Sequence, residues 1–332
     1  MSKRVSILVP VYGVEKYIGR CAESLFSQSY PNIEYVFVDD QTLDSSIHIL
    51  DTVLDSFPER KESVHIIHHE HHRGLAAARN TALDYATGEF VFWVDSDDWV
   101  EKDALKVLMD KQEKNDADIV FGWIRKKRKD GISTMLTPAY KTKDEMMTDI
   151  FRNHYNYFVW GRLMKRKIYE DHSIRCKEGV DYCEDMWHMF PVAYYADKIA
   201  CVDQFVYCYN QSNEDSYSFI YKNHFRLDYL KQYQQSVIFV ADFYRDKTEY
   251  NKLAHEFVAA RLRTILLKAA NQREKQYFEE LKRLIYKDYS IYCNAIGQNN
   301  FFIRSVCFNY FLLRLLYRPA YFVKSVFAKF HL

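Results

Sequence analysis

Four short apolar segments, separated by amphipathic stretches, dominate the first third of this chain of 332 residues. They span residues 5–9, 35–38, 64–67 and 90–94, and each is rich in Val, Ile or aromatic residues. Strands of a parallel sheet are covered on both faces, so they read as nearly continuous apolar runs. The pattern predicts a mostly parallel sheet at the centre of an α/β domain.

Helical patterns occupy the gaps between these strands, at about residues 15–27, 44–56, 74–86 and 102–115. A further strand is predicted at 119–123, and strands that alternate with helices of this length form right-handed βαβ units. We therefore expect a Rossmann-like, doubly wound sheet flanked by helices. Beyond about residue 216 the pattern is helical, with helices predicted at 223–244, 251–270 and 275–291.

Polar side chains follow three of the predicted strands at the point where each strand ends. The three ends read Pro10-Val11-Tyr12, Asp39-Asp40 and Asp95-Ser96-Asp97-Asp98. In a doubly wound sheet, ligands bind outside the carboxyl ends of the strands. Carboxylate oxygens suit Mg²⁺ or Mn²⁺, the cations that normally accompany a nucleotide diphosphate. The acidic cluster therefore predicts a metal-assisted nucleotide site at this edge.

Four motifs, in order, resemble those of family 2 glycosyltransferases, which have the GT-A fold. They are the opening at 5–12, the turn at 38–46, the helix start at 73–80, and the strand at 88–98 that ends in the D-x-D cluster. Together they cover about the first 120 residues, a domain-sized block. The sequence departs from the family pattern at Gln41, Leu43, Ser45 and His72.

The resemblance implies a donor site for a nucleotide-sugar, with a uridine base expected because Asp39 would accept a hydrogen bond from it. Asp97 would be the principal ligand of Mg²⁺ or Mn²⁺. The other residues expected to bind the donor lie at the same strand ends and at the predicted helix that follows the third strand. They are Pro10, Val11, Tyr12, Glu15, Asp40, Arg79, Asp95, Ser96 and Asp98.

An acidic pair about ninety residues beyond the D-x-D cluster resembles the family's catalytic element. The resemblance implies that Asp185 is the general base for an inverting transfer and that Glu184 contacts the acceptor or supports the base. A general base must take the acceptor's hydroxyl proton as the new C–O bond forms. The alternative is that the pair only complements the dipole of a helix predicted at 182–195. Trp160, in a segment that precedes this element, would either stack on a sugar or pack in the core.

Composition limits the other classes of function. The net charge of +1 predicts no nucleic-acid partner. Seven cysteines without a C-x-x-C pair indicate neither a disulfide framework nor a zinc ribbon. With no signal-peptide core and no apolar run long enough to span a bilayer, a cytoplasmic protein is expected.

Two polar runs have simple interpretations. The basic residues 125–129 precede Asp130-Gly131, a turn signal, and so predict the solvated tip of a hairpin. The histidines at 65–72 lack zinc spacing, which favours a structural or polar-loop role over a zinc site.

The final segment, 301–332, carries Lys and Arg among large apolar residues and contains no acid. It predicts either a helix that caps the core or one that lies on an anionic membrane surface, which we favour. A lipid-linked acceptor and a peripheral position on the cytoplasmic face would suit that contact.

The predicted organisation is a GT-A domain at 1–215, with a nucleotide-sugar half at 1–124 and an acceptor half at 125–215, followed by a helical region at 216–332. The predicted function is transfer of a sugar from a UDP-sugar to a hydroxyl of a growing glycan, such as a cell-surface polysaccharide. Two alternatives are a non-catalytic nucleotide-sugar-binding protein and a D-x-D phosphatase or phosphotransferase that uses Asp95 as its nucleophile.

Overall fold

The computed structural model describes residues 2–131, 133–152, 157–290 and 309–310. By contacts between Cα atoms, the chain divides into two compact units, Met1–His224 and Phe225–Leu332. The functional division predicted at residue 215 stays a prediction. Of the segment 301–332, only Asn309 and Tyr310 are described, so the predicted tail helix and its membrane contact lie outside the described residues.

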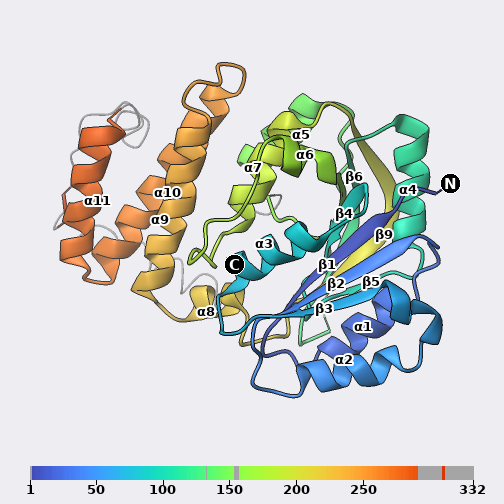
Figure 1. Cartoon of the computed structure of the whole chain (residues 1–332). Coiled ribbons are helices and arrows are strands. Elements are labelled where there is room, and N and C mark those ends of the chain that lie inside the picture. Colours follow the sequence, from blue (N-terminus) through green and yellow to red (C-terminus); the bar gives the residue numbers. More distant parts are fainter. Residues whose placement is uncertain (1, 132, 153–156, 291–308, 311–332) are drawn as a thin grey trace. The chain divides into compact units, whose positions relative to one another are not determined.

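The first unit is built on one sheet, which confirms the predicted α/β class (Figure 1). In the described residues it has nine strands. They are β1 (Val5–Val11), β2 (Ile33–Asp39), β3 (Val64–His68), β4 (Phe90–Trp93), β5 (Trp99–Val100), β6 (Ile119–Lys127), β7 (Ser133–Leu136), β8 (Arg162–Lys165) and β9 (Ile199–Asn210).

The sheet order is β3-β2-β1-β4-β8-β6-β9-β5, with β7 paired to β6. Strands β3, β2, β1 and β4 are mutually parallel, as their apolar character predicts. Strand β8 runs antiparallel between β4 and β6, while β9 pairs parallel with β6. The order places the carboxyl ends of β1, β2 and β4 together at one edge, where all three polar clusters lie.

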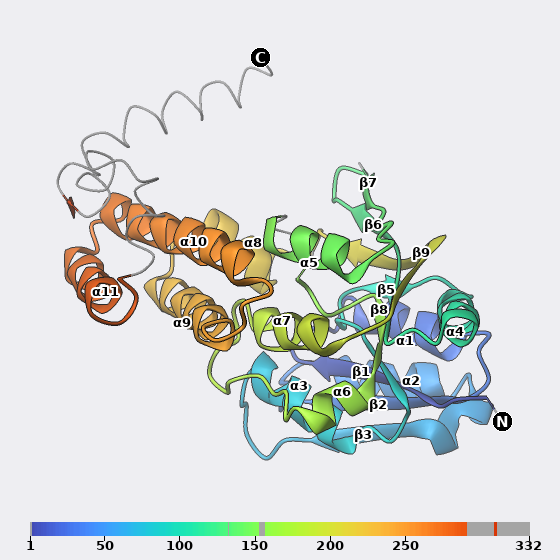
Figure 2. The ribbon, with the colours of Figure 1, turned by 90° about the horizontal axis from the view of Figure 1, so that it is seen from above.

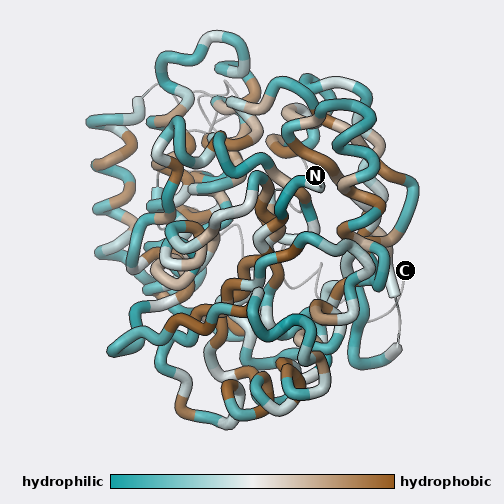
Figure 3. Tube along the Cα trace, turned by 45° about the vertical axis from the view of Figure 1, so that its right-hand side comes forward, coloured by the Kyte–Doolittle hydropathy of each residue, from teal (hydrophilic) through white to brown (hydrophobic). Residues whose placement is uncertain are grey.

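Helices cover both faces of this sheet (Figures 1 and 2). The helical segments of this unit are α1 (Ile18–Phe26), α2 (Ser46–Leu54), the 3-10 turn η1 (Pro58–Ser63), α3 (Leu75–Tyr85), α4 (Ala104–Asn115), α5 (Lys143–Arg152), α6 (Arg166–Asp171), α7 (Asp185–Tyr195) and α8 (Tyr217–Asn223). Figure 1 shows α1 and α2 below the strands and α3 with α7 above them. Brown, hydrophobic stretches alternate with teal, hydrophilic ones along the chain in Figure 3. Strands β1, β2 and β4 are buried along their whole length.

Strands β6 and β7 form the hairpin predicted from the basic run. Residues Lys127 to Gly131 are exposed, which confirms the solvated interpretation for 127–129, whereas Arg125 and Lys126 are partly buried on β6. The second unit contains α9 (Leu227–Phe243), α10 (Asn251–Asn271) and α11 (Lys275–Asp288). The single helix predicted at 223–244 is wrong at its start, because the chain leaves helical geometry at His224 and Arg226 between α8 and α9. None of the described helices is both long and apolar enough to cross a membrane.

A buried carboxylate fastens the amino ends of β1 and β2 to the turn before β4. Glu34 is 1% exposed and accepts hydrogen bonds from the hydroxyls of Ser6 (2.5 Å) and Thr87 (2.7 Å) and from the backbone N–H of Thr87 (2.8 Å). Burial alone would raise the pKa of Glu34, but these hydrogen bonds and Arg4 lower it below its usual value.

Glu34→Gln should destabilise the protein at pH 7 by about 1.5–3 kcal/mol, since hydrogen bonds to a charged group are lost. Because the folded-state pKa of Glu34 is lowered, its contribution is complete above the unfolded pKa and disappears as the pH falls through the folded pKa. Urea unfolding at pH 7 and pH 3 measures this, with the exposed Glu23→Gln on α1 as the matched control. An equal loss at both pH values would contradict the account.

Candidate functional site

The carboxyl ends of β1 and β2 form one side of the predicted donor site. Pro10 and Val11 are buried at the end of β1, where they pair with the end of β2. Asp39, the last residue of β2, has both carboxylate oxygens engaged. Its Oδ1 accepts the backbone N–H of Thr42 (2.8 Å), and its Oδ2 lies 2.9 Å from Nδ1 of His68. The carboxylate predicted to meet the base is therefore held in a fixed orientation.

The neighbouring acid, Asp40, fixes the start of α3. It is 2% exposed and accepts the backbone N–H groups of Arg73 (2.8 Å) and Gly74 (2.7 Å), while Nδ1 of His69 lies 2.7 Å from its Oδ1. Three histidines of this run, 68, 69 and 72, thus contact carboxylates, in keeping with the structural or polar-loop role predicted for the run. The predicted contact of Asp40 with the donor stays a prediction.

Tyr12 presents an aromatic face beside this turn. Its side chain is 47% exposed, and its ring stacks on His72 with centroids 4.1 Å apart. His72, where the family pattern has Asn, is itself held 2.8 Å from Oδ2 of Asp40. Glu15 accepts the backbone N–H of Ser45 (3.1 Å), so it orders the turn that follows Asp40.

In the acidic cluster after β4, Asp98 is held by hydrogen bonds from the protein itself. Asp98 is 1% exposed and accepts the hydroxyl of Tyr207 (2.7 Å) and the backbone N–H of Asn210 (2.7 Å). The Tyr207 oxygen in turn accepts the backbone N–H of Asp95 (3.1 Å). Burial and the neighbouring acids raise the pKa of Asp98 well above its usual value. Asp98 therefore ties the cluster to β9, the strand that ends beside it.

Asp97 and Asp95 remain partly exposed, whereas Ser96 between them is buried. Oδ2 of Asp97 accepts a hydrogen bond from the side-chain amide of Asn213 (2.8 Å). Burial and the charge of Asp95 raise the pKa of Asp97 to about 6. A bound cation stabilises carboxylates of like charge that lie close together. Within the described ranges, no group of three His, Cys, Asp or Glu side chains has the arrangement of a complete metal site.

Arg79 joins this cluster to the predicted catalytic pair. It projects from α3, is 1% exposed, and places Nη2 at 3.0 Å from Asp95, 3.2 Å from Glu184 and 3.7 Å from Asp185. Burial alone would lower the pKa of the guanidinium, but the three carboxylates raise it. The side chain thus holds acids from two distant parts of the chain together, and it presents almost no surface to a diphosphate.

The pair Glu184 and Asp185 lies where α7 begins, so the predicted helix starts later than residue 182. The Asp185 side chain is 18% exposed and accepts the backbone N–H of Val159 (3.3 Å), whereas Glu184 is 7% exposed against Arg79. Burial raises the pKa of Asp185 to about 6 and that of Glu184 well above its usual value. Of the two, Asp185 is the more accessible to an acceptor.

Trp160 belongs to a stack of aromatic rings. It is 6% exposed, with Phe158 at 3.8 Å and Tyr207 at 4.8 Å between ring centroids, both nearly parallel to it. The core-packing interpretation therefore describes Trp160 better than sugar stacking.

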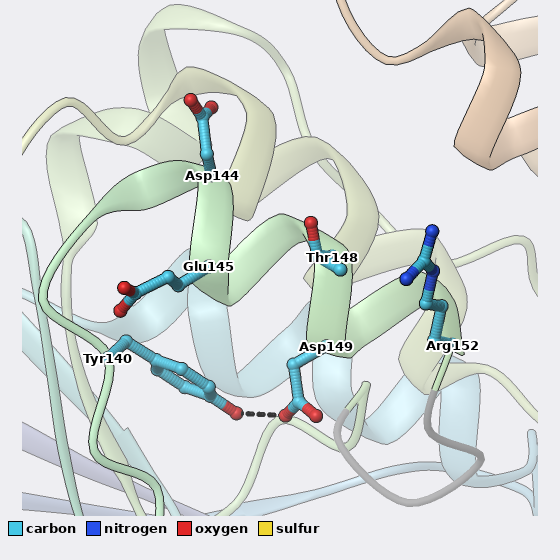
Figure 4. Close-up of a pocket in the computed structure, with 6 residues that line it drawn as sticks. All are labelled: Tyr140, Asp144, Glu145, Thr148, Asp149 and Arg152. Carbon is cyan, nitrogen blue, oxygen red and sulfur yellow. Dashed lines mark hydrogen bonds between the residues drawn. The ribbon is translucent and has the colours of Figure 1, made fainter.

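Two surface hollows lie elsewhere on this unit. The larger, of about 570 Å³, runs along α5, and within it the Tyr140 hydroxyl donates to Asp149 (Figure 4). None of the predicted site residues lines it. The second, of about 440 Å³, is lined in part by His68 and His69. These two histidines contact Asp39 and Asp40, so the hollow lies next to that pair of acids.

Several residues that hold the site together were not predicted, because they position the acids through hydrogen bonds and match no catalytic or metal-binding motif. Tyr207, Asn210 and Asn213 hold the acidic cluster from the end of β9. Their signal in the sequence is the polar run 210–216 directly after a Tyr-rich strand. Asp181 lies just before the predicted acidic pair, and the family resemblance implies no role for it.

Comparisons with known proteins agree with this geometry. The chain is 29% identical over 243 residues to EpsJ of Bacillus subtilis, described as an uncharacterized glycosyltransferase, a match that covers 71% of this chain and 69% of EpsJ. It is 30% identical over 212 residues to EpsH, described as a putative glycosyltransferase of the same organism, covering 62% of this chain and 60% of EpsH.

Among solved structures, the chain resembles residues 1–349 of TarS from S. aureus in complex with UDP. The TM-score is 0.68 at 21% identity, over 96% of this chain and 92% of the TarS chain. The same TarS fragment in complex with UDP-GlcNAc gives a TM-score of 0.69 at 18% identity, again over 96% of this chain and 92% of that chain. A mannosyltransferase from Pyrobaculum calidifontis, in complex with GDP-Man and Mn²⁺, gives 0.55 at 16% identity, over 96% of this chain and 88% of that chain.

The model of the family described as "Glycosyl transferase family 2" matches residues 6–173, which include every donor-side motif and stop short of the acidic pair. This match covers half of the chain and includes β1 to β4 and the acids that follow them. The chain belongs to glycosyl transferase family 2 and is a glycosyltransferase.

Proposed function

We propose that this glycosyltransferase moves a sugar from a UDP-sugar to a hydroxyl of a growing glycan, with inversion at the anomeric carbon. The observation that carries the proposal is the buried Arg79. It hydrogen-bonds both Asp95 of the predicted donor cluster and Glu184, and it forms an ion pair with Asp185. Donor acids and a candidate base thus share one site. A phosphatase that uses Asp95 as its nucleophile would have no use for this second acidic pair.

The donor base would stack on Tyr12 and donate an N–H to Asp39. The half-exposed ring of Tyr12 and the fixed carboxylate of Asp39 supply the two contacts that a uracil needs. The likeness to TarS bound to UDP and to UDP-GlcNAc supports a uridine donor.

The residues fit a divalent cation at Asp97. The carboxylate of Asp97 supplies the hard oxygen ligands that such a cation prefers. Burial and the charge of Asp95 raise its pKa to about 6, and a bound cation would favour its ionised form. Mg²⁺ or Mn²⁺ is typically held by one or two carboxylates, with the donor's phosphates as further ligands. When bound, the cation would stabilise the charge that develops on the UDP leaving group. Asp98 and Asn213 would orient Asp97 for this role.

Asp185 would take the proton of the acceptor hydroxyl. A base acts best when its pKa lies near the working pH, and burial moves the pKa of Asp185 in that direction, to about 6. Glu184, held against Arg79, would support it rather than contact the acceptor.

The acceptor would be a glycan or a lipid-linked saccharide, with the enzyme on the cytoplasmic face of the membrane. The basic, aromatic segment 301–332 would make that surface contact. A panel of UDP-sugars, assayed for Mn²⁺-dependent release of UDP, tests the activity and identifies the donor. Binding of UDP-sugars without any release would favour the non-catalytic alternative.

Asp97→Ala should abolish transfer and weaken metal-dependent binding of UDP, because the principal cation ligand is lost. Calorimetric titration of UDP with and without Mn²⁺ measures this, and the exposed Asp110→Ala on α4 serves as the matched control. Unchanged UDP affinity together with unchanged activity would show that the metal site has been assigned to the wrong residue.

Asp185→Asn should remove turnover while leaving UDP binding intact, with the exposed Asp197→Asn as its control. In the wild type, the base acts only when ionised. The rate should therefore fall about tenfold per pH unit below about pH 6, as expected for a base whose pKa is raised to about 6. Normal turnover of Asp185→Asn would refute the base assignment.

A further inference from the structure

The segment that leads into the catalytic pair is bound along the whole of α3. We call residues 175–184 the strap. Its contacts with α3 and the residues before that helix are Arg175 with Asp84 (2.7 Å), the backbone of Cys176 with Asn80 (2.8 and 2.9 Å), Glu178 with Arg73 (2.8 Å), Asp181 with Ala76 (2.9 Å) and Glu184 with Arg79 (3.2 Å). The strap thus runs from the carboxyl end of α3 to its amino end and returns to Arg79.

Asp181 makes the contact at the amino end of α3. Its Oδ1 accepts the backbone N–H of Ala76, one of the N–H groups that a helix leaves without an internal partner. The carboxylate approaches so closely because residue 74 is Gly: a Cβ there would lie 2.4 Å from Oδ2 of Asp181, and its φ of +91° also disfavours other residues.

The same helix end is held by acids from both halves of the domain. Asp40, beside the predicted base contact, holds the N–H groups of Arg73 and Gly74. Asp181, four residues before Asp185, holds Ala76. The orientation of α3 is therefore fixed with respect to the donor turn and to the strap, and α3 carries Arg79, which holds Glu184 and Asp185.

We propose that Asp181 is a positioning residue of the transfer reaction, which sets the place of Asp185 relative to the bound donor by anchoring the strap to α3. The proposal rests on the proposed function, in which Asp185 is the base. Asp181 touches neither donor nor acceptor in this account. Its loss should displace the base while Tyr12, Asp39 and Asp97 keep the UDP site intact.

Asp181→Ala tests this role, with two readouts. The kcat for UDP release, measured with the most active UDP-sugar of the panel, should fall about ten- to a hundredfold, the usual effect of a misplacement of about 1 Å. The Kd for UDP in the presence of Mn²⁺ should stay within about twofold, a change of less than about 0.5 kcal/mol. Asp181→Asn keeps an oxygen that can accept from Ala76 and should restore kcat.

Glu178→Ala is the matched control, because it removes an exposed acid from the same strap, where a surface ion pair contributes little. Asp185→Asn is measured in parallel. If Asp181→Ala keeps its kcat while Asp185→Asn is inactive, the positioning role is overturned and the base assignment stands. An active Asp185→Asn overturns both. A parallel loss of kcat, UDP affinity and melting temperature in Asp181→Ala, without rescue by Asn, means a purely structural role and also overturns the proposal.

Discussion

A buried guanidinium surrounded by three carboxylates is the interaction on which the rest of the site depends. Arg79 is 1% exposed, and a charge so far from water is tolerated only when it is paired. Its partners, Asp95, Glu184 and Asp185, outnumber it. Burial, together with the neighbouring acids, raises the pKa values of Glu184 and Asp185 in spite of Arg79. Arg79 thus links residue 95 to residues 184–185, and the group as a whole has more negative than positive charges. In the proposed mechanism, cation binding at Asp97 and proton uptake by Asp185 would both depend on that excess of negative charge.

The sheet order explains why these groups meet. Strands β2, β1 and β4 lie side by side and parallel, so Tyr12, the turn after Asp39 and the acidic cluster emerge at one edge. Strand β9 then reaches the same cluster through Tyr207 and Asn210, which hold Asp98. Asp98 is therefore buried in structural hydrogen bonds. Asp95 and Asp97 remain partly exposed.

The parallel strands and the donor cluster could be predicted from the sequence, because continuous apolar runs and acids at strand ends are local patterns. The short strands β5, β7 and β8 could not be predicted, because two to four residues show no periodicity. These segments are extended because they pair with neighbouring strands. The same holds for single side chains. Arg79 was expected at the diphosphate, yet its partners come from residues 95 and 184–185, and only tertiary structure shows them. Asn213 and Asp181 are ordinary polar residues until the fold places them against Asp97 and Ala76.

Arg79 and Glu184 form one buried contact between the acidic cluster after β4 and the predicted catalytic pair. A double-mutant cycle in urea tests it directly. Arg79→Gln should cost about 3–5 kcal/mol in the wild-type background, because buried carboxylates lose their counter-charge. The cost should fall by at least about 1 kcal/mol when Glu184→Gln is already present, since one of those charges is then absent. An equal cost in both backgrounds, within about 0.5 kcal/mol, would contradict the account.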